Sequence, residues 1–272
     1  MKESKILFTD LDGTLLSDDK SISKENIKAI QLALSMGHYI AIATGRSVSS
    51  GRKVARELGL TLPGCYMIAF NGAVLYDCAA DRILKEKTVP IEHVNTLFDK
   101  AKESGLYVQT YSKQDVIAQE HTKELDYYCK RTKMKYKLVR DIKSGLTSEP
   151  NKVLLIALEE KERLVEFQKE NREWEKGKVS SFFSCDEYLE YCPLDITKGT
   201  GVDYLCNFLD ISIENTIAIG DERNDLPMIE KAHIGIAMKN ANQELKEKAD
   251  YITEFTNNEN AIAEIIYKFL IN

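Results

Sequence analysis

The stretch that decides the fold is Phe8-Thr9-Asp10-Leu11-Asp12-Gly13-Thr14-Leu15. The apolar run from Lys5 to Thr9 predicts a buried strand, and this strand leads directly into two aspartates. Side chains two residues apart on an extended chain point the same way, so the carboxylates of Asp10 and Asp12 can face one spot. Gly13 then lets the backbone turn and approach a ligand closely.

Two carboxylates at the end of a strand suit a metal site or acid/base chemistry. In open sheets of parallel strands, ligands bind outside the carboxyl ends of the strands. Carboxylates there suit Mg²⁺, which prefers hard oxygen ligands. They also suit a division of labour between a nucleophile and a general acid/base. The alternative is a plain loop in which the aspartates only cap a helix.

A second stretch, residues 41–46, ends an apolar run with Thr44, Gly45 and Arg46, just before a predicted helix. A helix N-terminus with free N–H groups is a natural anion site, and Thr44 can donate a hydrogen bond to a phosphate oxygen. The alternative is that Thr44 is only a helix cap. A Walker loop is excluded, because Arg52-Lys53 stand where its Lys-Ser/Thr pair would be.

A third stretch places Lys198 at the start of a predicted helix, directly after Asp195-Ile196-Thr197. A lysine at this end of a helix is unfavourable against the helix dipole. This position indicates a separate role, such as neutralising a phosphoryl group. A solvated surface charge is the alternative.

The fourth stretch, Ile219-Gly220-Asp221-Glu222-Arg223-Asn224-Asp225, again ends an apolar strand with glycine and a carboxylate. Four residues after Asp221, Asp225 precedes a predicted helix that has Pro227 in its first turn. This acidic loop could complete a magnesium site, and an ordinary capping loop is the alternative.

The order of strands and helices predicts an α/β core interrupted by a second domain. Strands alternate with helices over 1–81 and again over 193–272, which predicts a parallel sheet covered on both faces. Residues 82–192 instead follow a helix, strand, strand order, which predicts an α+β module with an open sheet. The turns at Ala79–Asp81 and Cys192–Pro193 are the expected hinges.

Composition narrows the kind of partner. The 272 residues carry 43% hydrophobic and 29% charged side chains and a net charge of -6, with a pI of about 5.5. A net negative charge argues against a nucleic-acid-binding protein, because phosphate backbones attract Lys and Arg. No apolar run approaches the roughly 20 residues that span a bilayer, and no apolar signal core precedes Asp10. The six cysteines form no CxxC pair, so we expect reduced thiols in a cytoplasmic protein rather than a zinc site.

Taken in order, these stretches resemble the motifs of the haloacid dehalogenase-like superfamily over the whole chain. DLDGTL at 10–15 is similar to its first motif, Thr44 to its second, Lys198 to its third, and GDERND at 220–225 to its fourth. The resemblance implies a Rossmann-like core with a central parallel sheet. The insert resembles the α/β cap of Cof-type hydrolases (type IIB), as do residues 70–73 and 235–241, although Lys239 stands where the family often has glycine.

The resemblance also implies a magnesium-dependent phosphatase acting on small phosphorylated metabolites, such as sugar phosphates, nucleotides or cofactor phosphates. Asp10 would attack phosphorus to form an aspartyl-phosphate, and Asp12 would act as acid and base, which favours a phosphatase over the dehalogenase branch. Mg²⁺ would be held by Asp10, the backbone carbonyl of Asp12 and Asp221, with Asp225 supporting the metal shell. The phosphoryl oxygens would contact Leu11, Thr44, Gly45, Lys198 and Asn224. The cap would set substrate specificity, with Arg46, Tyr111 and Glu187 as candidate substrate contacts.

Two rival functions remain open. A phosphomutase of the phosphomannomutase type would need an arginine cluster in the cap, and the arginines there are spread along the sequence at Arg131, Arg140, Arg163 and Arg172. A non-catalytic binding protein on the same fold would be expected to lack a motif residue, and every one is present. The sequence carries no indication of the oligomeric state.

Overall fold

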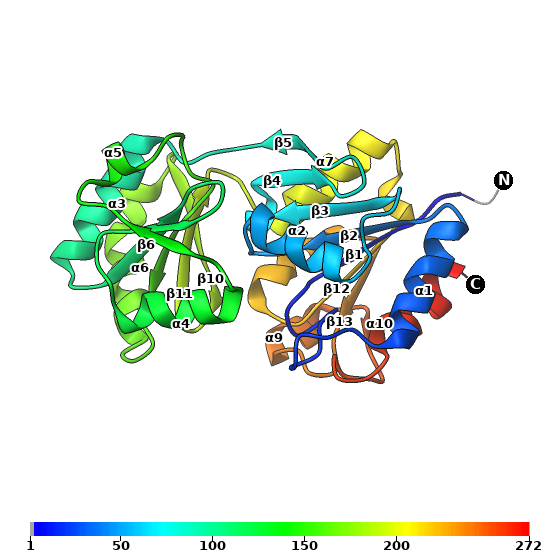
Figure 1. Cartoon of the computed structure of the whole chain (residues 1–272). Coiled ribbons are helices and arrows are strands. Elements are labelled where there is room, and N and C mark those ends of the chain that lie inside the picture. Colours follow the sequence, from blue (N-terminus) through cyan, green and yellow to red (C-terminus); the bar gives the residue numbers. More distant parts are fainter. Residues whose placement is uncertain (1–2, 272) are drawn as a thin grey trace. The chain divides into compact units, whose positions relative to one another are not determined.

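The computed structural model describes residues 3–271 and divides them into two units. The core unit contains the chain up to Gly45, Gly51–Lys85 and the chain from Thr197 onward. The inserted unit contains Arg46–Ser50 and Glu86–Ile196. Figure 1 shows the two units, each with its own sheet and helices. Within residues 3–271, no helix is both long and apolar enough to cross a membrane.

The core unit is built on an eight-stranded sheet. From β14 to β3 all neighbouring strands are parallel, and β4 pairs with β3 in the antiparallel direction. Strand β1 is fully buried at the centre of the parallel part, as expected for an apolar strand covered on both faces. In sheet order the strands are β14 (Tyr251–Ile252), β13 (Ile234–Ala237), β12 (Thr216–Gly220), β1 (Ile6–Thr9), β2 (Tyr39–Ala43), β3 (Cys65–Ala69), β4 (Val74–Asp77) and β5 (Arg82–Glu86).

Helices cover both faces of this sheet. Helix α1 packs against α10 and the π-helical segment η4, whereas α7 packs against α8, and α8 against α9. From β1 the chain adds β2 and β3 on one side of the sheet, and from β12 it adds β13 and β14 in the opposite direction. Because crossovers between parallel strands are right-handed, the helices that connect the first set lie on one face and those that connect the second set lie on the other. The helical segments are α1 (Lys24–Ser35), α2 (Val48–Glu57), η1 (Phe70–Gly72), α7 (Lys198–Leu209), η2 (Ile213–Asn215), η3 (Arg223–Asp225), α8 (Leu226–Lys231), α9 (Gln243–Lys248), α10 (Ala261–Ile265) and η4 (Ile266–Ile271).

The inserted unit has a six-stranded sheet that is antiparallel except for the pair β7 and β8. In sheet order its strands are β10 (Val179–Cys185), β11 (Tyr188–Pro193), β9 (Val153–Ile156), β6 (Tyr107–Tyr111), β7 (Val116–Ala118) and β8 (Tyr136–Leu138). Its helices are α3 (Ile91–Glu103), α4 (Lys123–Thr132), α5 (Ile142–Gly145) and α6 (Glu162–Glu175).

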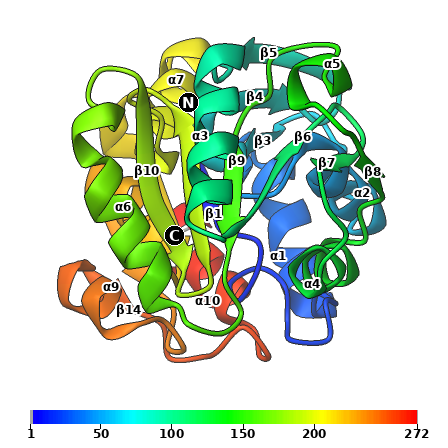
Figure 2. The same ribbon diagram turned by 90° about the vertical axis from the view of Figure 1, so that its left-hand side faces the viewer.

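The two faces of the inserted sheet differ in chemistry. Helices α3 and α6 cover one face, and their apolar side chains pack on Val153, Leu155 and Leu189 (Figure 2). Because side chains alternate along an extended chain, the residues next to these in sequence point to the other face. There the buried Lys152 ammonium lies 2.9 Å from a carboxylate oxygen of the buried Glu190. The inserted unit therefore has an apolar face and a buried polar face.

The observed division differs from the expected domain boundaries. The core unit extends to Lys85 rather than ending at Asp81, because Arg82–Glu86 forms β5 at the edge of the core sheet. Asp81 has a positive φ of 54° and sits in the turn between β4 and β5, so this turn connects two strands of one sheet. At the second boundary, the core unit resumes at Thr197, and Cys192–Pro193 forms the end of β11. The units therefore meet in the chain at Lys85–Glu86 and Ile196–Thr197, each four residues after the expected boundary.

Candidate active site

The sheet brings the candidate residues to one edge. Asp10 follows β1, Thr44 follows β2 and Asp221 follows β12, and these three strands are neighbours. The N–H of Asp10 donates to the carbonyl of Ile219 at 3.0 Å, and the N–H of Thr44 donates to Ile68 at 2.8 Å. These bonds continue the strand pairing by one residue, so Asp10 and Thr44 are held at the carboxyl ends of the strands, where ligands bind in such sheets.

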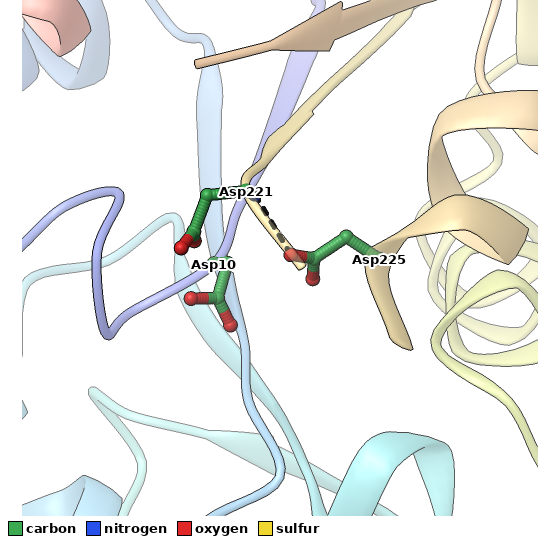
Figure 3. Close-up of side chains that lie close together, drawn as sticks. All are labelled: Asp10, Asp221 and Asp225. Atoms are coloured by element: carbon green, nitrogen blue, oxygen red, sulfur yellow. Dashed lines mark hydrogen bonds between the residues drawn. The ribbon is translucent and has the colours of Figure 1, made fainter. Parts of the chain in front are cut away.

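Three aspartates form an acidic cluster at this edge (Figure 3). Asp10, Asp221 and Asp225 each offer a carboxylate oxygen, and these oxygens lie within 4.8 Å of one another. Asp10 is 7% exposed and Asp225 is fully buried. Buried carboxylates this close together repel one another and need a cation nearby.

Lys198 provides one positive charge for this cluster. Its ammonium lies 2.5 Å from Oδ1 of Asp10 and also donates to Oδ1 of Asp225. The side chain is fully buried at the first position of α7, a helix that is capped by the hydroxyl of Thr197. A fully buried lysine between two carboxylates is not the solvated surface charge of the alternative interpretation.

Asp225 is fixed through both of its oxygens. Oδ2 accepts the N–H groups of Asp221 and Glu222, each at 3.0 Å, and Oδ1 accepts from Lys198. Gly220 is required beside it, since a Cβ at that position would lie 2.4 Å from Cγ of Asp225. The carboxylate of Asp225 thus shapes the loop after β12 and orients the ammonium of Lys198.

Asp221 is held from the first loop. The hydroxyl of Thr14 donates to Oδ1 of Asp221 at 2.7 Å. Gly13 has a φ of +82°, and a Cβ there would lie 2.3 Å from Oδ2 of Asp221. Gly13 is therefore required for two reasons: other residues rarely adopt its positive φ, and any side chain there would collide with Asp221.

The pKa shifts of Asp10, Asp221 and Lys198 indicate an excess of negative charge in the cluster. Burial raises the pKa of Asp10 to about 7; Lys198 opposes this shift and Asp225 adds to it. The pKa of Asp221 is raised well above its ordinary value by burial and by Asp10 and Asp225. Burial alone would lower the pKa of Lys198, but its two carboxylate partners raise it. One ammonium does not balance three carboxylates, and this set of hard oxygens fits a divalent cation such as Mg²⁺.

The carboxylate of Asp12 lies outside this cluster. It is 39% exposed, and one oxygen accepts a hydrogen bond from the ammonium of Lys20 at 2.9 Å. The two aspartates of the first motif therefore have different surroundings: Asp10 is buried beside the buried Lys198, and Asp12 is partly exposed beside the exposed Lys20. Different surroundings are what separate roles for the two carboxylates require.

The candidate phosphate-binding residues come from separate loops. Leu11 and Thr44 are buried, and the carbonyl of Thr44 accepts the N–H of Asn71 at 3.0 Å. The side-chain amide of Asn224 donates to Oδ1 of Asn71 at 2.9 Å. A Cβ at Gly45 would lie 3.1 Å from the same Oδ1. Asn71 thus lies beside Thr44, Gly45 and Asn224, and the sequence had indicated it only within residues 70–73, as part of the resemblance to Cof-type hydrolases.

The segment after β13 ties the first and fourth loops together. The side-chain amide of Asn240 donates to the carbonyl of Gly13 at 2.8 Å, and the N–H of Asn242 donates to the carbonyl of Asp221 at 3.0 Å. The N–H of Lys239 donates to the hydroxyl of Thr253, and its ammonium donates to the carbonyl of Glu254. Lys239, which stands where the family often has glycine, is therefore held in this loop by its own hydrogen bonds.

The candidate substrate contacts of the inserted unit form hydrogen bonds or ion pairs with other residues of that unit. Tyr111 is 2% exposed, and its hydroxyl accepts a hydrogen bond from Gln109 at 2.9 Å. Glu187 pairs with Lys161 at 3.1 Å. Arg163 donates to the carbonyls of Ser104 and Gly105 and also pairs with Glu160. Arg46 directly follows Gly45 and is half-buried.

Comparison with known proteins places this site in a family. A family model for haloacid dehalogenase-like hydrolases matches residues 7–266, so the chain belongs to that family. It is 27% identical to a putative phosphatase of Streptococcus pyogenes over 98% of this chain and 99% of that protein. It is 29% identical to the 5-amino-6-(5-phospho-D-ribitylamino)uracil phosphatase YcsE of Bacillus subtilis, over 98% of this chain and 96% of that one.

Solved structures agree with the sequence comparisons. A haloacid dehalogenase-like hydrolase from Bacteroides thetaiotaomicron superposes with a TM-score of 0.88 at 29% identity, over 98% of this chain and 99% of that one. These findings confirm the expected family, the α/β core with an inserted α+β unit, and an enzyme of the phosphatase class.

Proposed function

We propose that this chain is a magnesium-dependent phosphatase that hydrolyses small phosphorylated metabolites through an aspartyl-phosphate at Asp10. The observation that carries the proposal is the convergence of Asp10, Lys198, Asp221 and Asp225, residues from three distant stretches, in one buried cluster. A phosphate ester and a carboxylate repel each other, so attack by Asp10 needs positive charge and hydrogen-bond donors at the same place.

Asp10, Asp221 and the backbone carbonyl of Asp12 would hold Mg²⁺, with Asp225 behind them. The short distances between the carboxylate oxygens and the raised pKa of Asp221 support this donor set. When bound, the ion would offset the charge of the phosphoryl group and the nucleophile. Asp225 already accepts three hydrogen bonds, so its part is to orient Lys198 and the loop rather than to bind the ion directly.

In the first half-reaction an oxygen of Asp10 forms a bond to phosphorus, and the bond from phosphorus to the ester oxygen breaks. Asp12 gives its proton to the departing alkoxide, which leaves as an alcohol. In the second half-reaction Asp12, now a carboxylate, takes a proton from water as that water attacks phosphorus. The bond to Asp10 breaks, and inorganic phosphate and the starting protonation states result.

The phosphoryl oxygens would be bound by donors from several loops. Lys198 supplies the charge, and Thr44 and Asn224 supply side-chain donors. The backbone N–H groups of Leu11 and Gly45 complete the set. Such fixed donors stabilise the charge that spreads over the phosphoryl oxygens during transfer.

The inserted unit would act as the cap that recognises the organic part of the substrate. The expected substrates are phosphate esters of polar alcohols, such as a sugar, nucleotide or cofactor alcohol. The ribitylaminouracil phosphate of the Bacillus subtilis relative is one substrate of this kind. Six free cysteines support a reducing compartment, so we place the activity in the cytoplasm. Arg46 is the proposed substrate contact beside the phosphate site.

The test is release of inorganic phosphate from a panel of phosphorylated metabolites, with Mg²⁺ and with EDTA. The proposal predicts magnesium-dependent release of phosphate and alcohol in equal amounts from a subset of the panel. An isomerised sugar phosphate without free phosphate would indicate a mutase instead. No turnover of any substrate with Mg²⁺ would contradict the proposal.

A further inference from the structure

Asn71 lies where the loops that follow β2, β3 and β12 meet. It is in η1, directly after β3, and is 1% exposed. Its N–H donates to the carbonyl of Thr44 at 3.0 Å, and its Oδ1 accepts from Nδ2 of Asn224 at 2.9 Å. The same oxygen would lie 3.1 Å from a Cβ at Gly45. Asn71 therefore contacts the loop after β2 through its backbone N–H and the loop after β12 through its side chain.

The backbone at this position is strained. Phe70, Asn71 and Gly72 have successive positive φ values of 49°, 55° and 115°. Residues other than glycine adopt this region at a cost that the surrounding structure must offset. A turn alone would be satisfied by glycine, which adopts positive φ without that cost. Asparagine adopts positive φ more readily than most residues, but a carboxamide that is 1% exposed also needs polar partners, so its presence has a reason beyond the turn.

The hydrogen bond to Asn224 supplies that reason. The carboxamide nitrogen of Asn224 carries two protons, and one of them is directed to Asn71. This bond fixes the rotation of the Asn224 amide and so fixes the direction of its second N–H. On the other side, the bond from the N–H of Asn71 fixes the Thr44 carbonyl and, through it, the start of the loop that carries Gly45.

We propose that Asn71 is a positioning residue that aligns the donors of Thr44, Gly45 and Asn224 on one phosphoryl group. This inference rests on the proposed function, because it assigns those donors to phosphate. Asn71 acts through its neighbours and does not itself touch the reacting atoms. Its removal is therefore expected to weaken phosphate binding through Asn224, while the fold is kept.

The test is a double-mutant cycle between Asn71→Gly and Asn224→Ala. Glycine keeps the positive φ and the backbone N–H and removes the carboxamide with its Oδ1 acceptor. Asn71→Gly is expected to lower kcat/KM and weaken inhibition by inorganic phosphate about tenfold, the size of one lost hydrogen bond. Adding Asn224→Ala should then cost no more than about twofold further, because its alignment is already lost. Asp210→Gly, at an exposed positive-φ position, is the matched control and should behave as wild type.

Fully additive losses, or wild-type kinetics and phosphate inhibition in Asn71→Gly, would overturn the inference. If Asn71→Gly does not fold, Asn71→Asp replaces it in the cycle. Aspartate keeps the acceptor oxygen, so Asn224→Ala should cost as much in that background as in the wild type, and a clearly smaller cost would count against the inference. The proposed function is judged separately: it fails if the wild type releases no phosphate or if Asp10→Asn retains turnover, whatever the cycle shows.

Discussion

The ammonium of Lys198 lies 2.5 Å from Oδ1 of Asp10, and both groups are buried although 188 positions separate them in the chain. The same ammonium contacts Asp225. This relationship puts positive charge beside the proposed nucleophile, and it keeps a carboxylate with a raised pKa next to a permanent cation. It also explains why a lysine is placed at the unfavourable end of a helix.

Replacement of Lys198 by methionine should lower kcat by about 10²- to 10³-fold, the range seen when one preorganised donor to a transition state is removed. Steady-state phosphate release measures this, with circular dichroism to show that the variant is folded. Lys231→Met is the matched control, because Lys231 pairs with Asp203 at 3.0 Å with both side chains substantially exposed. Equal activity in the two variants would contradict the role assigned to Lys198.

Gly13→Ala should impair the metal site, whereas Gly37→Ala should not. Both glycines have a positive φ, so alanine costs about 1–2 kcal/mol of stability at either position. Only at Gly13 does the added methyl group collide with Asp221, and no atom lies within 4 Å of a Cβ at Gly37. Titration of activity with Mg²⁺ should show a weaker response in Gly13→Ala alone. The same magnesium dependence in both variants would count against this arrangement.

The metal-free protein should become less stable as the pH rises from about 4 to about 7. Burial raises the pKa of Asp10 from 3.8 to about 7, so the folded state holds a proton that the unfolded state has lost in this range. Unfolding then releases a proton, and stability falls with increasing pH. Melting curves in EDTA across this range measure the effect. Mg²⁺ should raise the melting temperature most at the upper end, and an equal gain at every pH would argue against binding at ionised aspartates.

The Lys152–Glu190 pair should behave as a buried ion pair. Lys152→Met or Glu190→Leu alone leaves an uncompensated buried charge and should cost about 3–5 kcal/mol, whereas the two changes together should cost much less. Urea unfolding of the three variants measures this. Lys176→Met, which breaks a solvent-exposed pair with Glu173, should change stability little. Additive losses in the double variant would show that the charges do not interact.

Local sequence pattern was sufficient for much of the fold and for the residues of the acidic cluster. An apolar run followed by aspartate identifies the ends of β1 and β12, and the sheet order then brings Asp10 and Asp221 together. The pattern could not show that Asp12 turns to Lys20 while Asp10 faces Lys198, because both aspartates follow the same strand.

Features that depend on distant contacts were missed. The link between Asn71 and Asn224 joins residues 153 positions apart, and nothing in the local sequence around Asn71 indicated this partner. Strand β5 is short and mostly exposed, so its place at the edge of the core sheet depends on pairing with β4 rather than on its own pattern. Strand β8 and helix α5 were not predicted, since each is too short to show a period.

The most direct measurement of the central claim is to trap the covalent intermediate. An Asp12→Ala variant should form the aspartyl-phosphate with an activated substrate such as p-nitrophenyl phosphate but hydrolyse it slowly, because no base is left to activate water. Mass spectrometry of the acid-quenched protein should then find the phosphoryl group on the peptide that contains Asp10, and Asp10→Asn should carry none. A phosphoryl group on another residue, or unchanged turnover in Asp10→Asn, would contradict the account.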